Sequence, residues 1–357
     1  MEFNESQSYD WKTDGIPFGK QVILKKLKDQ VIVITGASSG VGLVTARKAA
    51  AQGAKVVLAA RNEDALKQLA DELNRLGHEA VWVKADVGKE LDVQRIADTA
   101  KEAFGGFDTW VNNAGITIFG NAMDVSDGDI RRMFDTTFWG VVYGSRAAVK
   151  HFKERGSAGA LINIGSIFGD VGTVIQSTYA AAKHAVHGWT NSLRMELEAE
   201  NAPVSVTLVH PGRIDTPYNE HAGNYLEEHP AHGGMIYPPD AIAEAILHAA
   251  EHPKRDMYVG SQARIASLLG TLAPRLTDKV VETYLSRTQH KNIPVESPES
   301  NALYQPGYGL QERGTNVGYV RSGSMYMKAS KYPGVVAAAA IGIGALLLAT
   351  AGINRRD

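Results

Sequence analysis

The chain has 357 residues, of which 44% are hydrophobic and 21% are charged, as in folded globular proteins and unlike disordered ones. Its 37 basic and 39 acidic residues leave a formal charge of −2, which gives no indication of a dedicated nucleic-acid-binding protein. The chain contains no Cys, which excludes disulfides, a thiol nucleophile and Cys-based metal sites but leaves the redox compartment open.

The N-terminal segment, residues 1–27, is interpreted as an extension ahead of the folded domain. It begins with a polar, acidic stretch, MEFNESQSYDWKTDG, and lacks the basic start and apolar core of a secretory signal. Regular patterning begins only near Gln30.

From Gln30 onward, short apolar runs alternate with helical patterns. Apolar, β-branched runs are typical of fully buried strands, and longer stretches that end at Gly are typical of helices. In the second helix, Asn62 is the expected N-cap and Gly77 the expected residue after its end. The predicted strands are residues 31–36, 55–61, 80–87, 109–115, 160–166, 204–212 and 256–260, and the predicted helices include 42–53, 62–77 and 240–251.

Strands that alternate with helices predict a parallel sheet covered by helices on both faces. Right-handed crossovers then give an α/β, doubly wound, Rossmann-type fold of about seven strands. We expect one such domain over residues 28–287. Ligands of these folds bind at the carboxyl ends of the strands, so the functional residues are expected there.

The composition changes after about Arg287. Residues 288–334 are rich in Gly, Pro, Ser and Tyr with little apolar periodicity, which predicts a flexible linker of low order. Residues 335–353 are 19 residues without a charge, and as a helix they would span about 28 Å, close to a bilayer core. We expect a transmembrane or membrane-associated helix, with the folded domain on the cytoplasmic side. The alternatives are a buried or surface-docked tail and a soluble cytoplasmic protein.

The stretch TGASSGVG, residues 35–42, lies between the first predicted strand and the first predicted helix. Gly36 can make a tight turn, Gly40 lets a pyrophosphate approach the backbone, and Gly42 lets helix and strand pack closely. No Gly-Lys-Ser/Thr follows, so this is not the phosphate loop of nucleotide hydrolases. A plain turn is the alternative. The dinucleotide-binding residues predicted here are Gly36, Ser38, Ser39, Gly40, Val41 and Gly42.

The end of the second predicted strand discriminates between nicotinamide cofactors. NAD sites typically place an acid there for the ribose 2′-hydroxyl, whereas NADP sites use an Arg for the 2′-phosphate. Here the strand ends in Ala-Ala-Arg61, and the nearby Glu63 and Asp64 fit the first turn of the next helix. We therefore expect NADP (NADPH) as the cofactor, with NAD as the less favoured alternative.

Tyr179 and Lys183 are four residues apart in a predicted helix and therefore lie on one helix face. An ammonium group beside a phenol lowers the phenol pKa, which would let Tyr179 exchange a proton near neutral pH. Ser166 ends a predicted strand, where its hydroxyl can hydrogen-bond a substrate carbonyl. An isolated Tyr-x-x-x-Lys pair often arises by chance, and ordinary helix packing is the alternative.

Together these motifs resemble the short-chain dehydrogenase/reductase family, in its compact single-domain branch, over about residues 27–262. The resemblance rests on motifs in matching order and spacing: TGASSGVG, Asp86-Val87, NNAG (112–115), Ser166, Tyr179-x-x-x-Lys183 and PGRIDT (211–216). It implies hydride transfer between a carbonyl and a secondary alcohol, with the hydride carried by the cofactor.

The resemblance also implies a role for each matching residue. Tyr179 would be the general acid or base, Lys183 would bind the nicotinamide ribose and lower the Tyr179 pKa, and Ser166 would orient the carbonyl. Asp86 and Val87 would flank the adenine. The other cofactor-binding residues that it implies are Asn113, Ala114, Gly115, Pro211, Gly212, Ile214 and Thr216.

One position departs from the family pattern. The helix after NNAG usually carries an Asn that binds a water of the proton relay, but the matching residue in FDTTFWG is Thr137. A Thr hydroxyl can bind a water or bond back to its own helix, yet it cannot do all that an amide does. Thr137 is thus a fourth candidate catalytic residue, with a neutral replacement as the alternative.

The remaining expectations concern the substrate and partners. His210, His221, His229 and His232 occur at irregular intervals, so no metal site is predicted. Residues 218–238 fit a loop over a small or apolar carbonyl or alcohol substrate. A homo-oligomer is expected and no nucleic-acid partner. The alternative functions are a non-catalytic NADP-binding redox sensor or membrane scaffold and, less favoured, a nucleotide-sugar epimerase or dehydratase.

Overall fold

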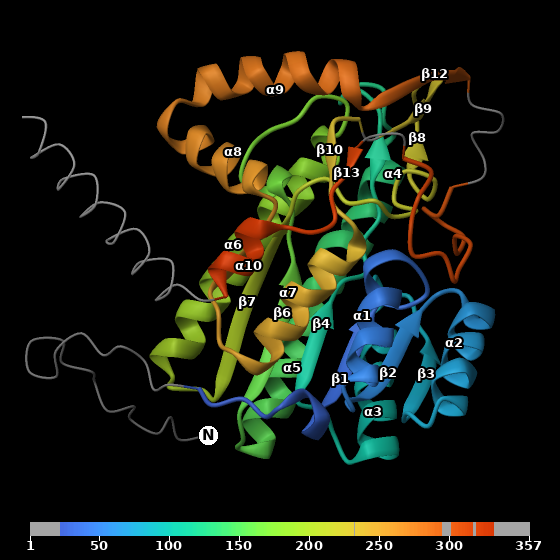
Figure 1. Cartoon of the computed structure of the whole chain (residues 1–357), viewed down its shortest axis with the longest axis vertical. Coiled ribbons are helices and arrows are strands. Elements are labelled where there is room, and N and C mark those ends of the chain that lie inside the picture. Colours follow the sequence, from blue (N-terminus) through green and yellow to red (C-terminus); the bar gives the residue numbers. More distant parts are fainter. Residues whose placement is uncertain (1–21, 232, 295–300, 317–318, 332–357) are drawn as a thin grey trace, which may run out of the picture.

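The computed structural model describes residues 22–231, 233–294, 301–316 and 319–331 (Figure 1). The predicted membrane segment, residues 335–353, and residues 1–21 of the predicted N-terminal extension lie outside these ranges. Within them, no helix combines the length and apolar character that crossing a membrane requires.

A sheet of seven parallel strands forms the centre of the fold, in the order β11-β7-β6-β4-β1-β2-β3. The predicted doubly wound α/β sheet is thereby confirmed. The strand order reverses between β1 and β4, and in such folds this point marks the ligand-binding crevice. The strands are β1 (Val31–Thr35), β2 (Lys55–Ala60), β3 (Ala80–Lys84), β4 (Thr109–Asn112), β6 (Gly159–Ile164), β7 (Val204–Pro211) and β11 (Asp256–Val259).

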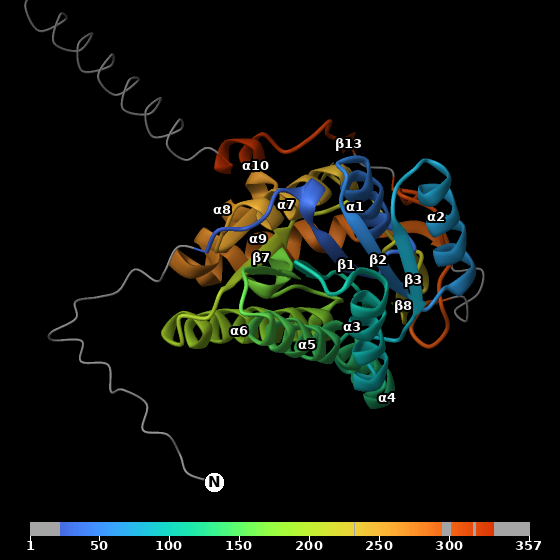
Figure 2. The same ribbon diagram turned by 90° about the horizontal axis from the view of Figure 1, so that it is seen from below.

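Helices cover both faces of the sheet (Figure 2). Leu66 and Ile246 belong to the core under one helical layer, and Phe152 and Leu197 to the core under the other. The apolar strands are buried from both sides, which explains their unbroken runs of Val, Ile and Leu. One layer consists of α1 (Gly40–Ala51), α2 (Glu63–Arg75) and α7 (Pro239–Glu251), the other of α3 (Glu90–Phe104), α5 (Gly140–Arg155) and α6 (Ser177–Ala199).

The ends of α2 illustrate how local sequence sets these elements. The Asn62 side chain accepts a hydrogen bond from the backbone N–H of Ala65, and Gly77 beyond the helix has a positive φ of 85°. Both features were predicted, because Asn satisfies an unpaired helix N–H and Gly tolerates the left-handed conformation.

Residues 218–238, predicted as a loop over the substrate, are tied down by three small two-stranded sheets. Two of these sheets connect the segment to residues after the predicted domain. The pairs are β5 (Ile118–Phe119) with β8 (Gly223–Asn224), β9 (Glu228–Pro230) with β12 (His290–Pro294), and β10 (Met235–Ile236) with β13 (Tyr319–Val320).

The C-terminal part differs from the predicted linker of low order. Residues 301–316 pack on the domain, and Leu303 is buried in a cluster with Ile118 and Tyr179. This segment needs no apolar periodicity, because its backbone groups are satisfied by the domain itself: Leu310 N–H donates to the carbonyl of Ser38 at 2.8 Å. Two helices, α8 (Ser261–Leu272) and α9 (Pro274–Thr288), follow β11, and the short α10 (Met325–Ser330) lies beside α8.

Candidate active site

A cleft at the carboxyl ends of the central strands brings most of the predicted site residues together. Gly42 and Thr137 are buried behind its wall. The predicted residues that line the cleft are Gly36, Ser38, Ser39, Gly40, Val41, Arg61, Asp86, Val87, Asn113, Ala114, Gly115, Ser166, Tyr179, Lys183, Pro211, Gly212, Ile214 and Thr216.

The glycine turn between β1 and α1 requires its glycines. Gly36 and Gly40 have positive φ angles of 68° and 52°, which side chains with a Cβ rarely adopt. A Cβ at Gly42 would lie 2.1 Å from the carbonyl oxygen of Gly36, so only Gly lets α1 start this close to the turn. The turn therefore presents backbone and a helix N-terminus to the cleft, an arrangement suited to a phosphate group.

Thr35 fixes the NNAG segment to this turn and was missed by the sequence reasoning. Its hydroxyl donates to the carbonyl oxygen of Val111 at 3.1 Å and accepts from the N–H groups of Asn113 at 3.0 Å and Ala114 at 3.1 Å. The only signal in the sequence was a polar residue at the end of an otherwise apolar strand. Thr35 thereby sets the spacing between two walls of the cleft.

Tyr179 lies near the N-terminus of α6, where its hydroxyl contacts two other hydroxyl-bearing side chains. Its side chain is hydrogen-bonded to Ser166 and to Tyr218, whose ring centroid is 5.7 Å away. Burial raises the pKa of the Tyr179 phenol, although both hydrogen bonds act to lower it. The predicted lowering of this pKa is therefore not observed, because burial outweighs the stabilisation of the phenolate.

Lys183 lies one helical turn after Tyr179, as predicted. Its Nζ is 5.7 Å from the centroid of the Tyr179 ring and donates to the carbonyl oxygen of Ile164 at 2.7 Å. Burial lowers the pKa of Lys183 to about 8. Its ammonium thus sits beside the phenol in a site from which most water is excluded.

Thr137 does not face the cleft. It lies in a π-helical turn, Asp135–Trp139, which joins α4 (Asp127–Phe134) to α5. Its hydroxyl accepts from the N–H of Ile116 at 3.1 Å and donates to the carbonyl of Ile116 at 2.8 Å. The hydroxyl is thereby committed to the backbone that follows NNAG, which favours a positioning role over direct water binding.

Arg61 projects from the end of β2 into the cleft, where it meets the C-terminal segment. Its guanidinium donates to the carbonyl oxygen of Leu303 at 3.1 Å and to that of Ala302. Arg132 also donates to the Leu303 carbonyl, at 2.9 Å, and pairs with Asp86 at 2.8 Å. Burial, followed by repulsion from Arg132, lowers the pKa of Arg61.

The segment 301–311, which we call the strap, closes this end of the cleft. The carbonyl of Gln311 accepts from the N–H of Gly40 at 2.8 Å, and the carbonyl of Gly307 accepts from Asn62 at 2.9 Å. Pro306, Gly307 and Tyr308 line the cleft directly. Sequence reasoning missed these residues because a Gly-, Pro- and Tyr-rich segment carries no periodic signal.

Of the four histidines considered in the sequence, His232 lies outside the described residues, and His210 and His221 lie in different surroundings. His221 packs edge-on to Tyr308 with ring centroids 4.5 Å apart, whereas His210 is buried on β7. Among the described residues, one group has the ligand atoms of a possible metal site within 4.8 Å of one another, namely Asp170, His187 and His210. These side chains are hydrogen-bonded to each other behind Ser166.

Comparison with known proteins adds the family. The model of the short chain dehydrogenase family matches residues 30–225. The chain belongs to the short-chain dehydrogenase family. This short-chain dehydrogenase is 67% identical to the uncharacterized oxidoreductase YxnA of Bacillus subtilis (strain 168) over 321 residues, which are 90% of each chain. It is 37% identical to an uncharacterized oxidoreductase of Staphylococcus aureus (strain MRSA252), over 64% of this chain and 94% of that one.

A solved structure supports the same assignment. The crystal structure of a short chain dehydrogenase/reductase from Burkholderia phymatum, in complex with NAD, is similar to this short-chain dehydrogenase with a TM-score of 0.60 and 26% identity. The similarity covers 77% of this chain and 100% of that one. The protein is thus an oxidoreductase with a nucleotide-binding, Rossmann-like fold.

Proposed function

We propose that the protein interconverts a carbonyl and a secondary alcohol with NADP(H), and that Tyr179 is the general acid or base. One observation carries the proposal: the Tyr179 hydroxyl meets Ser166 on a cleft whose other wall is the glycine turn. A proton donor and a dinucleotide-shaped cradle on one cleft are what carbonyl reduction needs.

Each side chain then has one task in the reduction direction. The cofactor, when bound, supplies the hydride to the carbonyl carbon. Ser166 donates a hydrogen bond that orients the carbonyl, and the Tyr179 hydroxyl gives its proton to the oxygen. The Lys183 ammonium stabilises the phenolate that remains. Thr137 acts indirectly, by holding the backbone at Ile116 in place.

The residues present fit a dinucleotide. The turn at Gly36 and Gly40 lines the cleft in a positive-φ conformation that glycine allows, and α1 begins there with its positive end. Arg61 is the group that favours NADP over NAD, because a guanidinium matches a phosphate and β2 ends without an acid.

The substrate is proposed to be small or apolar. Near Tyr179 the cleft is lined by the apolar or aromatic side chains of Ile116, Ile167, Phe168 and Tyr218. Such a surface gains free energy by burying hydrocarbon and leaves the carbonyl to Ser166 and Tyr179.

The proposal is tested with a panel of aldehydes and ketones, each assayed with NADPH and with NADH. Wild type is expected to turn over at least one substrate with preference for NADPH, and Tyr179→Phe is expected to lose turnover about 100-fold or more while still binding NADPH. Arg61→Ala is expected to reduce the preference for NADPH. Equal turnover by wild type and Tyr179→Phe would rule out the proposed acid. Cofactor binding without turnover on any substrate would favour the non-catalytic sensor or scaffold.

Membrane association is proposed as well, and one surface supports it. On α8 and α9 seven large apolar side chains are exposed at helical spacing: Ile265, Leu268, Leu269, Leu272, Leu276, Val280 and Tyr284. Flotation of the full chain with phospholipid vesicles tests this, with Leu272→Glu as the disrupting variant. If the variant stays vesicle-bound but changes from an oligomer to a monomer, the same surface serves the proposed homo-oligomer instead.

A further inference from the structure

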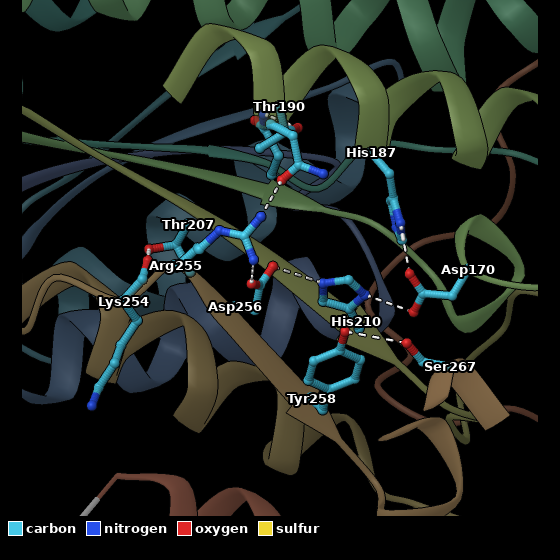
Figure 3. Close-up of polar contacts among 12 residues, drawn as sticks. Asp170, His187, Thr190, Thr207, His210, Lys254, Arg255, Asp256, Tyr258 and Ser267 are labelled. Carbon is cyan, nitrogen blue, oxygen red and sulfur yellow. Dashed lines mark hydrogen bonds and ion pairs between the residues drawn. The ribbon is translucent and has the colours of Figure 1, made fainter. Parts of the chain in front are cut away.

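Four side chains form a line of polar contacts, in which two buried histidines alternate with two partly exposed carboxylates (Figure 3). His187 comes from α6, Asp170 follows the 3-10 turn Ile167–Gly169, His210 lies near the end of β7, and Asp256 begins β11. Asp170 bridges the two imidazoles: its Oδ1 is 3.2 Å from His187 Nδ1, and its Oδ2 is 3.0 Å from His210 Nδ1. His210 Nε2 in turn lies 3.1 Å from Asp256 Oδ1.

The loop that carries Ser166 is folded around the His187 ring. The backbone N–H of Ser166 donates to His187 Nε2 at 3.3 Å. A Cβ at Gly165 or at Gly169 would lie 2.4 Å from the same nitrogen, so glycines on both sides of Ser166 make room for the imidazole. His187 therefore contacts the one loop whose orientation decides where the Ser166 hydroxyl points.

The hydrogen-bond partners of His187 determine which ring nitrogen carries its proton. Because Nε2 accepts from Ser166, the proton of the neutral ring must sit on Nδ1, from which it is donated to Asp170. A second proton, on Nε2, would place an Nε2–H donor against the N–H donor of Ser166. The contact to Ser166 consequently exists only while His187 is neutral.

His210 has the opposite state. Both of its ring nitrogens face carboxylates, an arrangement that favours the doubly protonated imidazolium, in which both nitrogens donate. Burial by itself would lower the pKa of His210, but the hydrogen bonds to Asp170 and Asp256 outweigh it and raise the pKa. Tyr258 stacks on the ring at 4.1 Å. His210 directly precedes Pro211 and Gly212 in the chain, and these two residues line the cleft.

Burial favours the neutral form of His187, and the charges around the ring act on its pKa in both directions. Burial is the largest cause of its lowered pKa. Asp170 opposes this lowering, whereas the positive charges of His210 and Lys183 add to it. Beyond His210, Arg255 pairs with Asp256 at 2.7 Å, and Arg194 on α6 faces the same carboxylate, so the cluster is closed on its far side by further charges.

We propose that His187 is a positioning residue for Ser166 and that burial, together with the positive charge of the neighbouring His210, holds it in the neutral form that this task requires. The inference rests on the proposed function, in which Ser166 orients the carbonyl. Protonation of His187 removes the acceptor from the Ser166 N–H, so the loop loses its anchor. Turnover then falls while cofactor binding at the glycine turn is retained.

The test uses pH profiles of kcat for the full chain. For carbonyl reduction, the kcat of wild type is expected to fall towards acid pH, and we call this fall the acid limb. Tyr179 cannot cause it, because a general acid becomes more effective as the pH falls. His187→Gln offers an amide that cannot gain a proton, so we expect the acid limb to disappear at the cost of a several-fold lower kcat at pH 8. His210→Gln removes the fixed charge and is expected to move the limb upward by about one pH unit.

A matched control is His184→Gln on the same helix, because His184 is exposed and bonds only to the carbonyl of Ala180. Its acid limb should equal that of wild type. An acid limb that is the same in wild type and His187→Gln would overturn the proposal. So would a stoichiometric divalent metal in the purified protein whose chelation abolishes turnover, since the cluster would then be a metal site.

Histidine NMR separates this inference from the proposed function, because it needs no substrate. With 15N-labelled histidine in the full chain, His187 is expected as the neutral Nδ1–H tautomer at pH 7.5, and His210 as a doubly protonated ring. The two His→Gln variants assign the signals. A neutral His210, or a His187 protonated on Nε2, would overturn the inference even in an active enzyme. The expected states in an inactive protein would instead point to failure of the proposed function alone.

Discussion

The two ends of the cleft are built in different ways. At the Tyr179 end, the functional side chains stand on α6 and at the end of β6, and the central sheet fixes their spacing. At the Arg61 end, the wall is the strap. Its backbone carbonyls accept hydrogen bonds from the side chains of Arg61 and Asn62 and from the N–H of Gly40, and these bonds hold it in place. The proposed catalytic side chains thus stand on the central α/β core, whereas the other end of the cleft is closed by a segment that follows the predicted domain.

The largest expected effect lies at the Tyr179 end. Lys183→Met should reduce kcat for carbonyl reduction by about 100- to 10,000-fold, because the phenolate left by Tyr179 loses its neighbouring charge in a buried site. Steady-state kinetics with saturating NADPH measures the loss. Lys150→Met, at an exposed position on α5, is the control. A variant that keeps more than a tenth of wild-type turnover would contradict the role.

At the Arg61 end, Gly309→Val should lift the strap. A Cβ at Gly309 would lie 2.2 Å from the Ala65 side chain, so the segment must move and at least one hydrogen bond to the turn is lost. A loss of about 1 kcal/mol corresponds to a roughly fivefold higher KM for NADPH, with kcat nearly unchanged.

Gly188→Ala controls for the loss of a glycine, because nothing lies within 4 Å of its added Cβ. If Gly309→Val instead lowers kcat and leaves the KM for NADPH as in wild type, the proposal that the Arg61 end serves cofactor binding and the Tyr179 end serves catalysis is wrong.

A smaller effect is expected for Tyr218→Phe. The Tyr218 hydroxyl lowers the pKa of Tyr179 by hydrogen bonding, so its removal should raise that pKa further. We expect the fall of kcat at alkaline pH to move to higher pH. We also expect kcat to decrease about threefold, much less than the loss expected when a catalytic acid is removed. Tyr225→Phe is the comparison, since the Tyr225 hydroxyl bonds to Asp129 away from Tyr179. An unchanged alkaline limb in Tyr218→Phe would argue against the contact.

A further effect concerns the stability of the fold at different pH values and not turnover. The folded-state pKa of Lys183 is about 8, below its ordinary 10.5, so the unfolded chain binds more protons between these values. Stability from this group therefore rises as the pH increases through that window, by about 2 kcal/mol between pH 7.5 and 9.5. Urea unfolding of wild type and Lys183→Met at both pH values measures it. Equal pH dependence in the two proteins would show that Lys183 is not desolvated.

Local sequence was sufficient for much of the fold and for the Tyr179 end. The apolar run of β1 and the capped ends of α2 follow from period and from Gly and Asn chemistry, which act over a few residues. The doubly wound topology then places Ser166 at the end of β6 beside Tyr179 on α6. That Ser166, Tyr179 and Lys183 meet on one cleft could be predicted, because motif order encodes a fixed geometry in this fold.

Only the tertiary structure decided the rest. The Arg61 hydrogen bond to Leu303 joins residues 242 positions apart, and no periodicity in the strap announces it. The raised pKa of Tyr179 depends on burial, which a Tyr–Lys spacing cannot report. The states of His187 and His210 likewise depend on which atoms surround each ring. The sequence determines elements and motif spacing because those are local, whereas protonation, enclosure and the strap arise from contacts that exist only once the chain has folded.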